Sequence, residues 1–175
     1  MIINKQEINA GENALVKLNV STLPSGTKIN IEAHVFRSKN PGPVMLVLGG
    51  VHGDEINGIE IVRRAVKSGL FHRISKGTVI AIPVLNVFGF INFSRELPDG
   101  KDVNRSFPGT SRGSLASRAA NALSKHILPL VDFGIDFHTG GASVYNYPQI
   151  RVAKSDEKAI ELAHAFSSPY IIKTG

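Results

Sequence analysis

Apolar and polar residues alternate along the first forty residues of the chain. Ile29, Ile31, Ala33 and Val35 fall on one side of this alternation, and Asn30, Glu32 and His34 fall on the other. A period of two is typical of a strand with one buried face. The turn-forming sequence Leu-Pro-Ser-Gly at residues 23–26 precedes this segment. We therefore predict antiparallel strands within residues 13–36, at one edge of a sheet.

From residue 41 onward, apolar runs alternate with segments of helical periodicity. Residues 43–48, 78–84, 133–137 and 170–173 are the runs that predict strands. Apolar residues at helical spacing predict helices over residues 55–66, 115–127 and 157–166, the first with Asp54 as its N-cap. Strands that alternate with helices indicate an α/β fold. We expect a central, mixed, mainly parallel sheet flanked by helices, with antiparallel strands at its N-terminal edge.

The organisation of the chain follows from its length and from one long connection. A chain of 175 residues suffices for one domain, or for one domain and a fragment. We predict a β extension in residues 1–40, packed on the sheet edge, and an α/β core in residues 41–175. Residues 86–113 are rich in Gly and Pro and show no period. An unstructured connection of about two dozen residues is usually functional.

The composition excludes several classes of protein. The absence of cysteine excludes a disulfide framework, a thiolate zinc site and a cysteine nucleophile. The formal net charge is +6, but the basic residues are spread along the chain and no nucleic-acid recognition motif is present. No segment is apolar enough to span a bilayer, and the N-terminus lacks the form of a signal peptide. We expect a cytoplasmic protein without nucleic-acid or membrane partners, and a homo-oligomer is compatible with the sequence.

Candidate functional residues lie where the predicted strands end. His52 and Glu55 follow the run at residues 43–48 in a glycine-rich turn, and His138 directly follows the run at residues 133–137. Ligands of open α/β sheets bind at the carboxyl ends of the strands. Two imidazoles and one carboxylate with an open fourth position are typical of a catalytic zinc site. Each residue alone is weak evidence, but their conjunction at these strand ends favours a metal site.

Other polar residues are weaker candidates for a catalytic or metal-binding role. We interpret four histidines as ordinary: His34 lies on the polar face of an edge strand, His72 lies in a loop, and His126 and His164 lie on helices without a ligand partner at a matching spacing. Ser114 and Ser117 lack a His-Asp partner pattern, which disfavours a serine hydrolase. Asp136 lies two residues before His138 on the same face of its strand, and we expect it to orient an imidazole.

Three motifs together resemble the succinylglutamate desuccinylase/aspartoacylase family, a branch of the zinc carboxypeptidase-like hydrolases. They are Gly-Val-His-Gly-Asp-Glu at residues 50–55, Asp-Val-Asn-Arg-Ser-Phe-Pro-Gly at 102–109 and Asp-Phe-His-Thr-Gly at 136–140. The resemblance extends from about Gly42 to the end of the chain. It implies a zinc-dependent hydrolase that cleaves the amide bond of a small anionic N-acyl amino acid.

The resemblance also implies roles for individual residues. His52, Glu55 and His138 would bind one Zn²⁺ per chain, as the strand-end argument also suggests. Asn104 and Arg105 would bind the substrate carboxylate, which suits the planar fork of arginine. Arg95 would polarise the scissile carbonyl. Glu96, beside it, departs from the aromatic residue that we expect in close relatives, which could alter the acyl preference.

The implied mechanism is attack of a metal-activated water on the amide carbonyl, with a carboxylate as general base. We interpret Asp54 as a helix cap and Asp136 as an orienting residue, so neither is our candidate for that base. In the resembled family the catalytic Glu lies well downstream of the third motif. We therefore expect the general-base Glu beyond residue 175, a core incomplete at its C-terminus, and no activity from residues 1–175 alone. We also expect Ile171 to Gly175 to end a central strand.

Two alternatives stay open at this point. A zinc carboxypeptidase acting on peptides would share the metal ligands and differ in its substrate cleft. A non-catalytic binding protein that retains the fold would bind its ligand without metal. The sequence alone does not specify the acyl group or the amino acid of the substrate.

Overall fold

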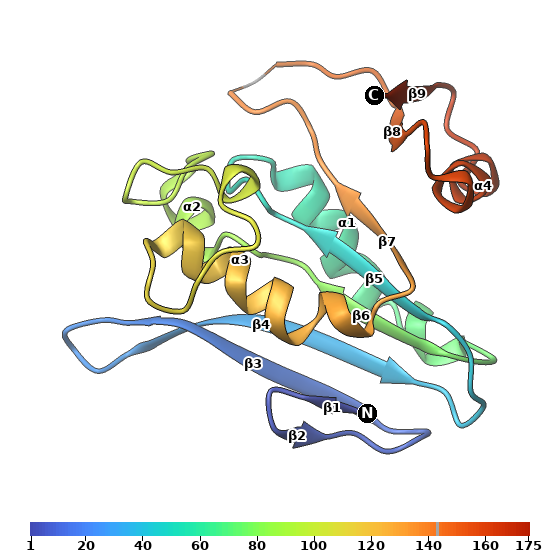
Figure 1. The fold of residues 1–175 in the computed structure, drawn as a ribbon, viewed down its shortest axis with the longest axis horizontal. Helices are drawn as coiled ribbons and strands as arrows, with labels where there is room; N and C mark the ends of the chain where they lie inside the picture. The colour runs from blue at the N-terminus through green and yellow to red at the C-terminus, as the bar shows by residue number, and fades with distance from the viewer. Residues whose placement is uncertain (143) are drawn as a thin grey trace. The chain divides into compact units, whose positions relative to one another are not determined.

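A five-stranded sheet organises the larger of two compact units in the computed structural model, which describes residues 1–142 and 144–175 (Figure 1). The units are Met1–Ala142 and Ser143–Gly175. The strands of the chain are β1 Ile2–Ile3, β2 Gln6–Glu7, β3 Asn13–Thr22, β4 Lys28–Arg37, β5 Val44–Gly49, β6 Thr78–Ile82, β7 Phe133–Phe137, β8 Ile150–Ala153 and β9 Ile171–Thr174. The α-helices are α1 Ile56–Lys67, α2 Val87–Asn92, α3 Leu115–His126 and α4 Glu157–Phe166. Three short 3₁₀ helices are η1 Leu70–Arg73, η2 Val103–Arg105 and η3 Leu128–Leu130.

The sheet has the strand order β3-β4-β6-β5-β7. β3 pairs antiparallel with β4, and β4 pairs antiparallel with β6. β5 lies between β6 and β7 and is parallel to both. The α/β class, the mixed sheet and the antiparallel N-terminal edge strands are thereby confirmed.

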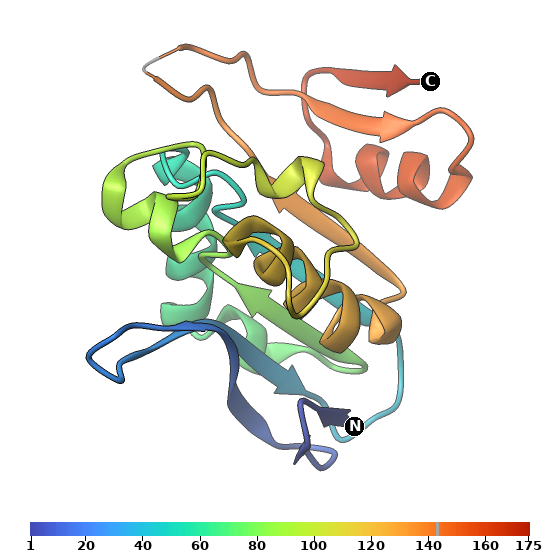
Figure 2. The ribbon, with the colours of Figure 1, turned by 60° about the vertical axis from the view of Figure 1, so that its left-hand side comes forward.

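Helices cover both faces of this sheet, and the strand residues divide between them by the period of two. Leu46, Leu48, Ile80 and Ile82 join the apolar cluster that includes the alanine-rich face of α3. Val47, Val79 and Ala81 join a second cluster with Val62 of α1. Figure 2 shows α3 and α1 on opposite faces of the sheet. Burial on both faces explains why these strands appear in the sequence as continuous apolar runs.

Three sequence predictions about elements are wrong. Residues 86–113 contain the helices α2 and η2, because Asn86 caps α2 by accepting a hydrogen bond from the N–H of Gly89 (2.8 Å). Asp54 does not cap α1, whose N-cap position is Glu55 and has no side-chain cap bond. The last strand is not central, because β9 pairs with β8 in a two-stranded parallel sheet of the second unit.

Two further points concern the organisation of the chain. The division into residues 1–40 and 41–175 stays a prediction, and β3 and β4 belong to the same sheet as β5 and β6. Among the described residues, no helix has both the length and the apolar character needed to cross a membrane.

Candidate metal centre

The pairing of β5 with β7 places the predicted ligands at one edge of the sheet. Gly49, the last residue of β5, lies opposite Phe137, the last residue of β7. His52 and Glu55 lie in the loop after β5, and His138 directly follows β7. The ligand atoms that His52, Glu55 and His138 offer all lie within 4.8 Å of one another. The predicted convergence of these three side chains is present in the structure.

The glycines of the loop after β5 are required by close packing and by backbone conformation. A Cβ at Gly53 would overlap the backbone of Gly89 and Phe90 in α2, and the N–H of Gly53 donates to the carbonyl of Ser94 (3.1 Å). Gly50 has a φ of +61°, which side chains with a Cβ rarely adopt. The loop therefore folds tightly under α2 and carries His52 into the interior.

The carboxylate of Glu55 lies between the two imidazoles. Its Oε1 is 2.6 Å from Nδ1 of His52, and its Oε2 is 3.0 Å from Nδ1 of His138. The N–H of Thr139 donates to the same Oε2 (2.9 Å). His52 and Glu55 are buried, with 2% and 3% of their surface exposed. Both Nδ1 atoms thus face one acidic centre.

A second carboxylate lies behind each imidazole. Nε2 of His138 is 2.8 Å from Oδ2 of Asp136, and Nε2 of His52 is 3.3 Å from Oδ1 of Asp102. A carboxylate at Nε2 favours a proton on that nitrogen and directs the Nδ1 lone pair toward Glu55, where a metal would bind, although Nη1 of Arg95 also lies 3.3 Å from Nδ1 of His52. The contact predicted between Asp136 and an imidazole is present.

The charges of this cluster are strongly coupled. Burial alone would raise the pKa of Glu55, but the hydrogen bonds from His138, His52 and Thr139 lower it well below its usual range. The hydrogen bond to Asp136, and then that to Glu55, raises the pKa of His138 to about 10, against the opposing effect of burial. The carboxylates around His138 therefore favour the protonated, positively charged form of its ring. The same negative charge would favour binding of a metal cation.

Arg95 reaches the cluster from the loop after α2. Its Nη2 donates to Oδ2 of Asp102 (2.9 Å), and its Nη1 lies 3.7 Å from Oε1 of Glu55. The carbonyl of Arg95 accepts a hydrogen bond from Nδ2 of Asn86, the cap of α2 (3.1 Å). The structure therefore brings Arg95 beside the two buried ligands. Glu96 is exposed on the same loop.

The two residues predicted to bind the substrate carboxylate lie on η2. Nδ2 of Asn104 is 3.4 Å from Nε2 of His52, so Asn104 borders the cluster. Arg105 is exposed, and within the described residues no hydrogen bond or ion pair holds its guanidinium. An arginine fork without a protein partner is free to bind a ligand.

Sequence reasoning missed the central position of Asp102. Its Oδ1 accepts the N–H of Asn104 (2.7 Å) and caps η2, while its two oxygens also contact His52 and Arg95. Burial would raise the pKa of Asp102, but Asn104, Arg95 and His52 together hold it below its usual value. The Asp-x-Asn spacing is a known turn signal that could have indicated the cap, but not the contact with His52.

The structure also shows the surroundings of two other polar residues that the sequence analysis considered, Asp54 and Ser114. Oδ1 of Asp54 is buried and has no hydrogen-bond partner among the described residues, and a Cβ at Gly141 would come within 2.5 Å of its Oδ2. Ser114 caps α3 by accepting from the N–H of Ser117 (3.3 Å), which gives it a structural role.

The sequence of the chain matches a known family and a known deacetylase. Residues 41–174 match the family described as the succinylglutamate desuccinylase/aspartoacylase catalytic domain. The chain is 30% identical over 172 residues to the N-alpha-acetyl-L-2,4-diaminobutyric acid deacetylase of Halomonas elongata, covering 95% of this chain and 50% of that protein.

Solved structures of proteins from the same family are also similar to this chain. The chain resembles an aspartoacylase family protein from Mesorhizobium loti with a TM-score of 0.80 and 31% identity, over 93% of this chain and 53% of that one. It resembles a succinylglutamate desuccinylase/aspartoacylase from Rhodobacter sphaeroides with a TM-score of 0.78 and 31% identity, over 93% and 51%. The chain therefore spans about half the length of the relatives it matches.

Proposed function

The chain belongs to the succinylglutamate desuccinylase/aspartoacylase family, and from this premise we propose that it forms the metal-binding part of a zinc-dependent deacylase. The substrate class is an N-acyl amino acid, whose amide bond is hydrolysed. The observation that carries the proposal is the convergence of His52, Glu55 and His138, with ligand atoms within 4.8 Å of one another, inside the segment that matches the family.

The residues present fit a single zinc ion per chain. We assign Nδ1 of His52, Nδ1 of His138 and the carboxylate of Glu55 as its ligands, because each Nε2 already faces a carboxylate. Two nitrogens and a carboxylate are the donor set of many catalytic zinc sites. Zinc bound there would supply Lewis-acid polarisation of the amide carbonyl and a lowered pKa for water.

Arg95 is suited to stabilise negative charge that develops on the amide oxygen. Its Nη1 lies beside the ligand cluster, and its Nη2 is fixed by Asp102, so the guanidinium is oriented before a substrate binds. Donors that are already oriented stabilise an oxyanion without reorganisation at the moment of reaction.

Arg105 and Asn104 are suited to bind the carboxylate of the amino-acid part of the substrate. Both lie on η2, whose orientation relative to the cluster is fixed by the cap and ion pairs of Asp102. Asn104 borders His52, so a substrate carboxylate bound at η2 would lie beside the ligand cluster.

The general base is assigned to none of the three carboxylates at the cluster. Glu55 accepts bonds from two imidazoles and a backbone N–H, Asp102 binds Arg95 and η2, and Asp136 binds His138. The lowered pKa values of Glu55 and Asp102 make these two carboxylates poor proton acceptors at neutral pH, and Asp136 is engaged with the ring of His138. The glutamate outside residues 1–175 that the family resemblance implies stays a prediction.

The experiment measures acyl release by the protein in its full gene-encoded length. N-acetyl and N-succinyl amino acids are offered, with an N-blocked dipeptide to detect carboxypeptidase activity. We expect acyl release by the zinc-loaded wild type, its loss in His138→Ala, and its retention in the exposed control His164→Gln. Cleavage of the dipeptide alone would favour a carboxypeptidase, and equal loss in the control would contradict the assignment of His138.

A further inference from the structure

A second concave site lies away from the metal cluster. It is a pocket of about 350 Å³ formed by the segment after β4, by η1 and by the residues before β3. Its lining includes Arg37, Ser38, Lys39, Asn40, Phe71 and His72. A volume of this order is typical of pockets that bind small molecules, about 300–1,000 Å³.

The pocket and the metal cluster lie at opposite ends of the strands. Arg37 ends β4 and pairs with Thr78, the first residue of β6. The metal ligands instead follow the last residues of β5 and β7, which are parallel to β6. Each strand residue advances the chain by about 3.3 Å, so the length of β6 separates the two sites by roughly 13 Å or more. The pocket is therefore distinct from the proposed substrate cleft.

Hydrogen bonds hold the walls of the pocket in place. The side chains of Ser38 and Asn40 both donate to the carbonyl of Ser75 (3.0 and 2.8 Å), and the N–H of Ser38 donates to the carbonyl of Gly77 (3.0 Å). The Phe36 ring packs against Phe71 and, edge to face, against His72, with ring centroids 5.5 and 5.0 Å apart. These contacts join the segment after β4 to η1, so the pocket exists before a ligand binds.

The lining of the pocket is basic and has unused donors. Arg37, Lys39 and His72 line it, and none of its described lining residues is acidic. Nη1 of Arg37 donates to the carbonyl of Ile8 (2.6 Å), while its other guanidinium N–H groups, the Lys39 ammonium and the His72 ring nitrogens have no hydrogen-bond partner in the described part of the chain.

Glu12 is attracted electrostatically to Arg37 but does not contact its guanidinium directly. The carboxylate of Glu12 instead accepts bonds from the N–H and the Nδ2 of Asn9 (2.8 and 3.2 Å). The like charges of Arg37 and Lys39 repel one another, and an anion between them reduces that repulsion.

We propose that this pocket binds a small polyanion that carries a phosphate or several carboxylates. The partly free guanidinium of Arg37 offers a directed N–H pair, Lys39 offers a donor from the same segment, and His72 offers donors from η1. The half-buried Phe71 ring supplies an apolar surface for a carbon skeleton. A concave site of this volume suits a small anion, whereas a nucleic-acid chain requires an extended basic stripe.

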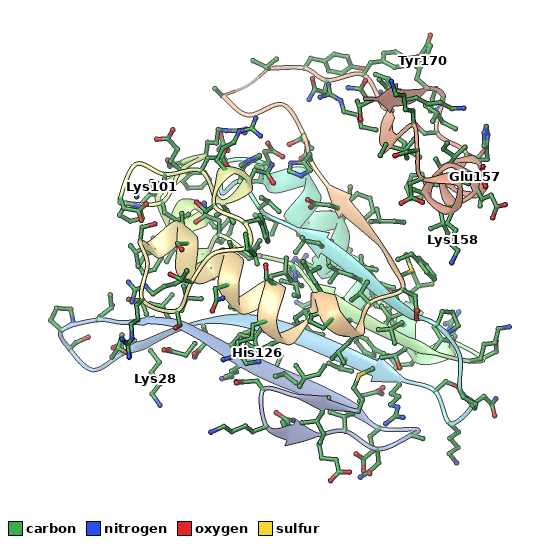
Figure 3. All side chains as sticks on the ribbon, viewed as in Figure 1. Lys28, Lys101, His126, Glu157, Lys158 and Tyr170 are labelled. Atoms are coloured by element: carbon green, nitrogen blue, oxygen red, sulfur yellow. The ribbon has the colours of Figure 1, made fainter. Side chains whose placement is uncertain are left out.

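The test is isothermal titration of the metal-free wild-type protein with inorganic pyrophosphate and, separately, with citrate at matched ionic strength. The test variant is the double substitution Lys39→Met and His72→Gln, which leaves the bond from Arg37 to Ile8 intact. The control is Lys28→Met with Lys158→Met. Lys28 starts β4 at the end opposite Arg37, and Lys158 lies on α4 in the second unit (Figure 3).

We expect saturable one-site binding of at least one anion, weakened about tenfold or more in the test variant because two charge-assisted hydrogen bonds are lost. The control should bind as the wild type does. Binding of pyrophosphate alone would identify a phosphate site, and binding of citrate would identify a carboxylate site. Heats of dilution only for both anions, or equal weakening in the control, would overturn the proposal.

Discussion

Replacing Asp136 by asparagine should weaken zinc binding about tenfold, or ~1.4 kcal/mol. Oδ2 of Asp136 is 2.8 Å from Nε2 of His138, and an amide oxygen in its place can still accept that hydrogen bond. The substitution therefore keeps the imidazole orientation and removes the charge that increases the basicity of Nδ1. Loss of such outer partners typically costs about 10–100-fold in metal affinity. The side chain of Asp136 is 36% exposed, which places the effect at the lower end of this range because solvent screens the charge.

The assay is competition for zinc between the protein and a chromophoric chelator at fixed pH. Asp136→Ala should weaken binding further, because it also removes the hydrogen bond that orients the ring. Glu157→Gln removes the same charge from exposed α4 and should leave the affinity unchanged (Figure 3). An unchanged zinc affinity in both Asp136 variants, with the fold intact by circular dichroism, would refute the idea that this carboxylate supports His138.

Three further predictions concern the substrate cleft, the fold and the pH dependence of stability. Arg105→Lys should raise KM for an N-acyl amino acid about tenfold with little change in kcat, because lysine keeps the charge but lacks the planar fork of arginine. Unchanged steady-state kinetics of the full-length protein would contradict this. Gly53→Ala should lower the free energy of unfolding by about 3 kcal/mol in urea titrations, because its Cβ would overlap the backbone of α2; a wild-type midpoint would disprove that packing. Burial lowers the pKa of His34 from 6.5, so the unfolded state binds the proton more readily, and stability should be lost as pH falls below about 6.5. His34→Gln should reduce that loss in thermal unfolding measured between about pH 7 and pH 5, and an identical pH profile would exclude His34 as its source.

The predictability of the fold depended on the length of each element. The period-two segment became β4, and the long helical patterns became α1, α3 and α4. The helix α2 has six residues and contains Gly89, so it is too short to establish a helical period. The strand β8 has only four residues, and the alternation of Ile150 and Val152 with Arg151 is too short to establish a strand period.

The position of the ligand cluster was predictable, but its surroundings were not. His52, Glu55 and His138 follow strand ends that any parallel α/β sheet brings to one edge. The contact between Asp136 and His138 followed from their two-residue spacing on one strand. The contacts of Asp102 with His52 and Arg95 depend instead on how residues 86–105 fold around α2 and η2, which no local pattern encodes. Asp54 does not cap α1 for a separate, local reason: the helix begins one residue later than expected, so Glu55 occupies its N-cap position.

The most direct test of the zinc assignment is an anomalous difference map, collected at the zinc absorption edge, from crystals of the zinc-loaded protein. The account predicts one peak per chain, about 2.0–2.2 Å from Nδ1 of His52, Nδ1 of His138 and a carboxylate oxygen of Glu55. A zinc peak bound elsewhere in the chain, or no peak among these three side chains in zinc-saturated crystals, would contradict it.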